Sequence, residues 1–173
     1  MKETNTKNLI VASLMTTLMC ILSPWSIPVG PIPVTLGVFC VFLSAMLLPG
    51  YYSLLSIGAY IGIALMGLPV CSGFNGGTAA ILGPTGGYIV GYIFIAFFTA
   101  LGKKSSHLPL TLISMLAGLA CCYAVGTAWF MFITGRDLMQ SLALCVIPFI
   151  PFDIIKGAAS VAIRVLLRKR IRI

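Results

Sequence analysis

Two charged residues, Asp153 and Lys156, stand in an apolar segment near the C-terminal end of the chain. Because they are three residues apart, they share one face of a helix, where the carboxylate can accept N–H groups and the ammonium can donate to an oxygen. A charge at the centre of a membrane span costs about 2.5–3.5 kcal/mol, and such residues are functional candidates by default. The pair has two interpretations: it compensates itself and fixes the helix, or it binds polar groups of a solute.

Other residues able to bind a small molecule lie in glycine-rich and aromatic stretches. Asn75 can both donate and accept hydrogen bonds. The run Gly83-Pro84-Thr85-Gly86-Gly87 opens a predicted helix, where backbone N–H groups can receive an oxygen. It is not followed by the Gly-Lys-Ser/Thr of a nucleotide-binding loop. Tyr88, Tyr123 and Trp129 can cover apolar rings, although each is also common at a membrane interface.

The elements that must position these residues belong to a membrane protein. Hydrophobic residues make up 60% of the 173 residues and charged residues 8%, whereas soluble domains carry about 25% charged residues. Residues 8 to 102, a run of 95, contain no Asp, Glu, Lys or Arg. These charges are too few to cover a water-facing surface. We therefore predict an all-α integral membrane protein whose single membrane domain covers residues 1–173.

Prolines and glycines divide the chain into six apolar segments, and a helix needs about 20 residues to cross a bilayer, with a range of about 17–25. The predicted spans are 7–23, 34–48, 51–68, 84–101, 108–133 and 152–169, with a short interfacial helix at 136–146. Residues 26–33 and 71–83 are predicted to be irregular. Glycines four residues apart, at 83, 87 and 91 and at 58 and 62, predict close helix packing. Packing is therefore the alternative to a binding role for Gly87.

The cations predict how the helices are oriented. Of the 11 Lys and Arg residues, nine fall on the side of the two termini, and Arg136 and Lys156 do not. Because positively charged loops stay in the cytoplasm, we predict cytoplasmic termini in a multi-pass protein of the bacterial plasma membrane. The loops at 24–33, 70–83 and 134–151 then face outward. Non-helical backbone at that depth is tolerated where it lines a cavity, so a solute site open to the outside is predicted.

The composition disfavours several function classes. One His and three acidic residues leave no acid–base pair and no metal cluster, so we predict no enzyme, no metal and no cofactor. The net charge of +8 comes from clusters that flank apolar segments, and no nucleic-acid partner is predicted. The six cysteines lack a C-x-x-C spacing and are predicted to be small buried apolar residues.

Four stretches carry a family resemblance: Ile-Pro-Val-Gly-Pro-Ile-Pro-Val-Thr-Leu at 27–36, Gly-Pro-Thr-Gly-Gly-Tyr at 83–88, Gly-Thr-Ala-Trp at 126–129, and Pro-Phe-Ile-Pro-Phe-Asp-Ile-Ile-Lys at 148–156. Together, and in this order, they resemble the BioY family, the biotin-binding S components of energy-coupling factor (ECF) vitamin transporters. The resemblance covers nearly the whole chain and implies the six-helix S-component fold with an outward site for biotin. Gly37 stands where the family often has Gln.

Biotin suits the candidate residues chemically, since its ureido ring offers two N–H donors and a carbonyl beside apolar rings and a carboxylate tail. The site hypothesised on this basis comprises Asn75, Thr85, Gly86, Gly87, Tyr88, Tyr123, Trp129, Asp153 and Lys156. In it Asp153 and Asn75 take the ureido edge, while Lys156 or the amides of residues 86 and 87 receive an oxygen. The residues leave open which polar end of biotin meets which group.

The resemblance also implies partners, namely a transmembrane coupling subunit and two cytoplasmic ATPase subunits. S components commonly dock through an Ala-xxx-Ala face on the first helix, and here that spacing reads Ala12-xxx-Thr16. Two alternative functions remain: an S component for another vitamin-like solute, or a self-contained secondary carrier or channel. Transport into vesicles that lack any ATPase would favour the carrier.

Overall fold

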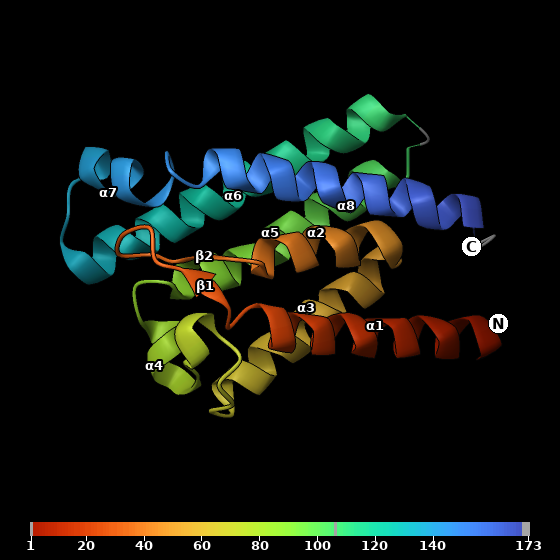
Figure 1. Ribbon diagram of the computed structural model, residues 1–173, viewed down its shortest axis with the longest axis horizontal. Coiled ribbons are helices and arrows are strands. Elements are labelled where there is room, and N and C mark those ends of the chain that lie inside the picture. Colours follow the sequence, from red (N-terminus) through yellow and green to blue (C-terminus); the bar gives the residue numbers. More distant parts are fainter. Residues whose placement is uncertain (1, 106, 171–173) are drawn as a thin grey trace.

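The computed structural model describes residues 2–105 and 107–170, which form helices and one short hairpin. The elements in chain order are α1 (Lys2–Leu22), β1 (Ser26–Ile27), β2 (Val34–Thr35), α2 (Gly37–Leu47), α3 (Gly50–Leu65), the 3-10 turn η1 (Ser72–Phe74), α4 (Gly77–Leu82), α5 (Gly86–Lys103), α6 (Leu108–Thr134), α7 (Leu138–Cys145) and α8 (Ile150–Arg170). Figure 1 shows both ends of the chain at one end of the molecule, and the hairpin, α4 and α7 at the other.

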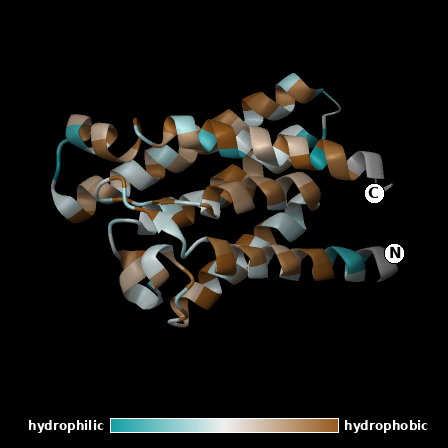
Figure 2. Ribbon diagram, viewed as in Figure 1, coloured by the Kyte–Doolittle hydropathy of each residue, from teal (hydrophilic) through white to brown (hydrophobic). Residues whose placement is uncertain are grey.

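The helices differ in their capacity to cross a bilayer. Within the described residues, α1, α5 and α6 are long and apolar enough to span alone, and α7 with α8 passes the same test as a pair bent by 47°. Helices α2 and α3 are apolar but shorter. Apolar residues make up much of each helix (Figure 2), and many large apolar side chains are exposed, as expected for a surface that faces lipid.

Proline and glycine define the sharp turns of the bundle. Pro49 precedes α3 and lets the chain reverse directly after α2. Gly135 ends α6 in the left-handed conformation (φ 68°), and its N–H donates to the Met131 carbonyl at 2.8 Å. This is a common glycine C-cap.

Two predicted irregular segments hold secondary structure. The segment 26–33 contributes β1, which pairs antiparallel with β2, so residues 34 and 35 are strand and not helix as predicted. The Thr35 hydroxyl accepts the Gly37 N–H at 3.2 Å, and α2 begins only at that glycine. The segment 71–83 contains η1 and α4. The backbone carbonyls and amides of η1 and α4 are partly hydrogen-bonded within these elements, as backbone that is buried or at membrane depth requires.

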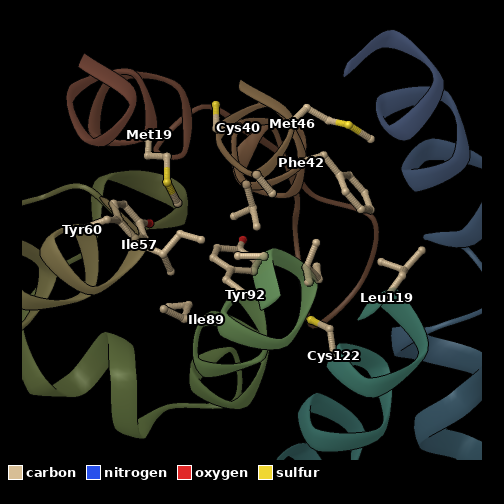
Figure 3. Packing of buried hydrophobic residues seen from close by; sticks show 14 of the residues in the cluster. Met19, Cys40, Phe42, Met46, Ile57, Tyr60, Ile89, Tyr92, Leu119 and Cys122 are labelled. Atoms are coloured by element: carbon tan, nitrogen blue, oxygen red, sulfur yellow. The ribbon is translucent and has the colours of Figure 1, made fainter. Parts of the chain in front are cut away.

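Helix α2 lies at the centre of the bundle and packs against α1, α3, α5 and α8. The main cluster of buried apolar residues surrounds it, and Figure 3 shows Phe42 and Cys40 of α2 beside Met19, Tyr60 and Tyr92 of three other helices. Eight residues of this 11-residue helix are buried. Because neighbouring helices surround α2, lipid does not contact this short helix on all sides.

Helices α5 and α6 form the most extensive interface between described elements, and glycines make it close. A Cβ on Gly91 would lie 2.6 Å from Cys122 Sγ, and one on Gly87 would lie 2.8 Å from Trp129 Cγ. Carbon atoms in contact normally lie about 3.5–4.0 Å apart, so α5 and α6 need glycine here. By contrast, a Cβ added to Gly58 or Gly62 would have no atom within 4 Å, so these two glycines do not form the packing face predicted for them.

Candidate solute-binding site

A cavity lies under the hairpin, between α5, α6 and α8, at the end of the molecule opposite the termini. Counting the part that is open to solvent, it holds about 650 Å³ of space between atoms. Ile32 and Pro33 of the β1–β2 connection cover one side, and Leu119 and Phe149 add apolar wall. The cavity therefore combines an apolar lining with a few polar groups.

The polar centre of this cavity is a three-residue cluster on α6 and α8. Lys156 Nζ donates to Asp153 Oδ1 at 2.8 Å, and Tyr123 Oη donates to Asp153 Oδ2 at 2.7 Å. Asp153 is 2% exposed and Lys156 9%. A buried carboxylate is stable only when its oxygens are paired, and here each oxygen has one partner. The cluster as a whole carries no net charge.

Hydroxyl groups line the remaining wall. The Tyr60 hydroxyl donates to the Val70 carbonyl at 3.0 Å, which ties α3 to the chain before η1. The Tyr88 hydroxyl and the Thr127 hydroxyl lie 3.1 Å apart across the α5–α6 interface. Tyr92 also lines the cavity and is buried. The hydroxyls of Tyr60 and Tyr88 are held by protein groups, so their rings are fixed as flat walls.

Five of the nine predicted site residues line the cavity: Thr85, Tyr88, Tyr123, Asp153 and Lys156. They come from the start of α5, the middle of α6 and the first turns of α8. Tyr88 lies on α5 and packs against Gly126 of α6. Asp153 and Lys156 are on one face of α8, as the three-residue spacing predicts.

The other four predicted residues do not line it, and each has a structural reason. Asn75 is exposed, and its side chain donates to the Ser72 carbonyl at 2.9 Å. Trp129 Nε1 donates to the Gly83 carbonyl at 3.0 Å, so the indole joins α6 to the chain before α5. The Gly86 N–H also donates to the Gly83 carbonyl at 3.0 Å. Gly87 packs against Trp129.

The docking face predicted at Ala12 and Thr16 lies inside the folded chain. Ala12 is 3% exposed and Thr16 6%. The Thr16 hydroxyl donates to the Ser56 carbonyl at 3.0 Å, which joins α1 to α3. Small residues at this spacing therefore pack α1 against its own neighbour, and a second subunit cannot reach them in this conformation.

Sequence reasoning missed several lining residues, among them Ser23, Thr35, Tyr60, Ser72, Tyr92 and Phe149. Tyr60 and Tyr92 each lie in a glycine-rich apolar helix, where their residue type alone does not mark them as site residues. Ser23 precedes the hairpin and Thr35 belongs to its second strand, and this hairpin was not predicted from the sequence. The one indication in the sequence was the concentration of polar residues at the outward ends of the spans.

The part of the chain that the structure describes contains no cluster of side chains suited to metal binding or redox chemistry. No group of three His, Cys, Asp or Glu residues lies close enough there to hold a metal ion. The six cysteines are free, and four of them are buried. Burial raises the pKa of the Cys71 thiol, which lies outside the spans. A raised pKa keeps this group a neutral, unreactive thiol.

The geometry agrees with what known proteins show. A family model described as the BioY family matches residues 1–173. The chain belongs to the BioY family. Among BioY proteins, the biotin transporter BioY of Thermotoga maritima is 38% identical over 164 residues, which cover 94% of this chain and 96% of the relative. The biotin transporter BioY of Lactococcus lactis subsp. cremoris is 34% identical over 175 residues, covering 95% and 92%.

A solved structure described as the S-component for biotin from an ECF-type ABC transporter has the same fold. It superposes with a TM-score of 0.89 at 35% identity and covers 98% of this chain and 94% of that chain. The predicted all-α membrane protein with an S-component fold is therefore confirmed. The BioY relatives are transporters, so this chain is a multi-pass membrane protein of a transporter family and not an enzyme.

Proposed function

We propose that this chain captures biotin from outside the cell and delivers it to the cytoplasm as the S component of an ECF-type importer. One observation carries the proposal: the buried Tyr123–Asp153–Lys156 cluster at the wall of an apolar cavity, in a chain that matches a biotin S component over 98% of its length. The names of the relatives support the same solute.

The charge of the cluster favours the ureido ring as the group that it binds. Asp153 and Lys156 together are neutral, and they place an acceptor beside a donor. A ureido edge presents N–H donors beside a carbonyl and carries no net charge, so it matches the pair without adding a buried charge. We assign the ureido N–H groups to Asp153 and an oxygen of biotin to Lys156. The rings of Tyr88, Tyr92 and Phe149 then face the apolar part of the ligand.

Equilibrium binding to the purified chain tests the proposal. Biotin should bind with a stoichiometry of one, whereas riboflavin and thiamine, which lack the ureido–thiolane rings, should not compete. A hydrogen bond to a charged group contributes about 1.5–3 kcal/mol, or about 10- to 150-fold in affinity. Asp153→Asn and Lys156→Ala should each weaken binding by that factor.

Matched controls separate this site from general effects of charge. Asp137 is an exposed aspartate on the outward loop, and Lys104 is an exposed lysine at the opposite end. Asp137→Asn and Lys104→Ala should keep the parent affinity. Correctly inserted Asp153→Asn and Lys156→Ala variants that bind biotin as tightly as the parent would refute the assignment, and absence of any biotin binding by the parent would refute the function.

We infer further that energy comes from a coupling subunit and two ATPase subunits, because no nucleotide-binding loop is present in the sequence. The outer face of α1 offers a surface for the coupling subunit. Ser13 and Thr17 are exposed there, four residues apart, and their hydroxyls donate to carbonyls of the same helix. Small residues with satisfied hydroxyls allow close approach of another helix.

Two measurements test this second inference. Biotin uptake into vesicles should require the ATPases and ATP, and uptake by the chain alone would refute the need for them. Ser13→Leu with Thr17→Leu should abolish co-purification of the coupling subunit and leave biotin binding unchanged. Ala12→Ser, a change at a buried position of the same helix, is the control that should leave co-purification intact.

A further inference from the structure

A second cavity lies at the opposite end of the molecule, where the positively charged tails and loops place the cytoplasm. It contains about 1,510 Å³ of space between atoms, open space included, compared with about 650 Å³ for the solute cavity. Its apolar walls come from three places: Met46 and Leu47 at the end of α2, Leu108 at the start of α6, and Val161 and Val165 on α8. It shares no lining residue with the solute cavity.

The cavity opens sideways, because α6 and α8 separate toward this end. Helix α6 packs extensively against α5, while α8 packs against α2, and α6 and α8 make at most slight contact. Figure 1 shows the start of α6 standing away from α8. Leu108 is 52% exposed and Val165 47%. In a membrane, an apolar opening between two helices is in contact with lipid chains.

Two cations lie at the base of this opening. Lys103 Nζ donates to the Leu48 carbonyl at 2.9 Å, and Arg164 Nη1 lies 3.5 Å from Met46 Sδ. The described residues that line the cavity include these two cations and no carboxylate. A lysine ammonium has three donors, and one of those of Lys103 is used by the carbonyl. Lys103 is the last residue of α5, so its charge lies at the level of the lipid headgroups.

We propose that this cavity binds an anionic phospholipid of the cytoplasmic leaflet, with its phosphate on Lys103 and Arg164 and an acyl chain between α6 and α8. Three features favour this occupant: charge complementarity to a phosphate, an apolar wall directly beside the charges, and a lateral opening to the leaflet that supplies it. Basic pockets between helices on the cytoplasmic side are suited to anionic headgroups. The site is independent of the solute that the other cavity takes.

The unaltered chain gives the first test. The purified full-length protein, stripped of lipid in detergent, is titrated with phosphatidylglycerol, phosphatidylcholine or inorganic phosphate, and bound lipid is counted by native mass spectrometry. One phosphatidylglycerol should bind per chain at least tenfold more tightly than phosphatidylcholine, and inorganic phosphate should not displace it. Equal affinity for the two lipids, or displacement by phosphate alone, would overturn the proposal.

Charge variants locate the site. An anionic surface attracts each nearby Lys or Arg by about 1 kcal/mol, or about fivefold in affinity. Lys103→Gln and Arg164→Gln should each weaken phosphatidylglycerol binding about fivefold, and the double variant about thirtyfold. Lys104→Gln removes the same charge from the adjacent exposed position, which does not line the cavity, and should have no such effect.

Biotin binding reports whether each variant is folded, since Lys103 and Arg164 lie outside the solute cavity. If the double variant does not fold, the two single variants and the comparison of lipids on the unaltered chain still decide. A folded double variant that retains phosphatidylglycerol as tightly as the parent would overturn the site. Loss of binding in Lys104→Gln as large as in the double variant would also overturn it.

Discussion

Gly126 on α6 is the position where a single methyl group should do most damage to the proposed biotin site. A Cβ there would lie 2.6 Å from Cγ of Tyr88 and closer still to two further ring atoms. Carbon contacts are normally about 3.5–4.0 Å, so the ring or the helix must move by about 1 Å. Tyr88 lines the cavity and is tied to Thr127 by its hydroxyl, so its ring cannot turn away without losing that bond.

Overpacking of this kind costs about 1–3 kcal/mol. We expect Gly126→Ala to lower the free energy of unfolding of the purified protein by that amount. The same substitution should weaken biotin binding at least tenfold. Thermal unfolding followed by tryptophan fluorescence gives the first quantity, and isothermal titration calorimetry gives the second.

Gly58→Ala is the matched control for this experiment. Gly58 is also helical and also belongs to a glycine pair with four-residue spacing, yet a Cβ added there would have no atom within 4 Å. Alanine favours a helix over glycine by up to about 1 kcal/mol, so this variant should be as stable as the parent or more so. If Gly126→Ala matched Gly58→Ala in both stability and affinity, the close α5–α6 contact and its role in shaping the cavity would both be wrong.

Three further substitutions test individual contacts. Tyr123→Phe removes the 2.7 Å hydrogen bond to Asp153 and should weaken biotin binding about tenfold in calorimetry; an unchanged affinity would show that this bond does not orient the carboxylate. Trp129→Phe removes the hydrogen bond to the Gly83 carbonyl and should lower the free energy of unfolding by about 1 kcal/mol, while the affinity for biotin stays within threefold. A loss of affinity without a loss of stability would show that Trp129 binds the ligand. Asn75→Ala should bind biotin within twofold of the parent, because its side chain is exposed, and a tenfold loss would contradict this.

The fold was predictable where one local property dominates. Scarcity of charge identified the membrane class, and Pro49 and Gly135 mark helix ends that the structure also has. Residues 34 and 35 were placed in a helix because their apolar character alone does not distinguish strand from helix. Their strand depends on pairing with residues 26 and 27, a contact that periodicity cannot reveal.

The candidate site was predictable in proportion to its charge. Asp153 and Lys156 stand out because charges are rare in an apolar chain, and both line the cavity. The partnership of Tyr123 with Asp153 depends on the register between α6 and α8, which the sequence of either helix leaves undetermined. Asn75 has suitable chemistry, but its own turn directs the side chain to Ser72. Residue types can thus indicate which residues are candidates for a site, whereas the direction of a side chain is known only from the folded structure.

The unequal lengths of the helices have a consequence for the surrounding bilayer. At about 1.5 Å per residue, the 16 residues of α3 extend about 24 Å and the 27 residues of α6 about 40 Å, on either side of a hydrocarbon core of about 30 Å. The perimeter of the protein therefore presents different apolar heights in different directions, and lipids must stretch beside α6 and compress elsewhere. Membrane thickness becomes a variable that acts on this protein directly. Acyl-chain length and sterol-like thickening agents should shift its preferred tilt, so vesicles of different lipid length are not interchangeable media for measuring its transport.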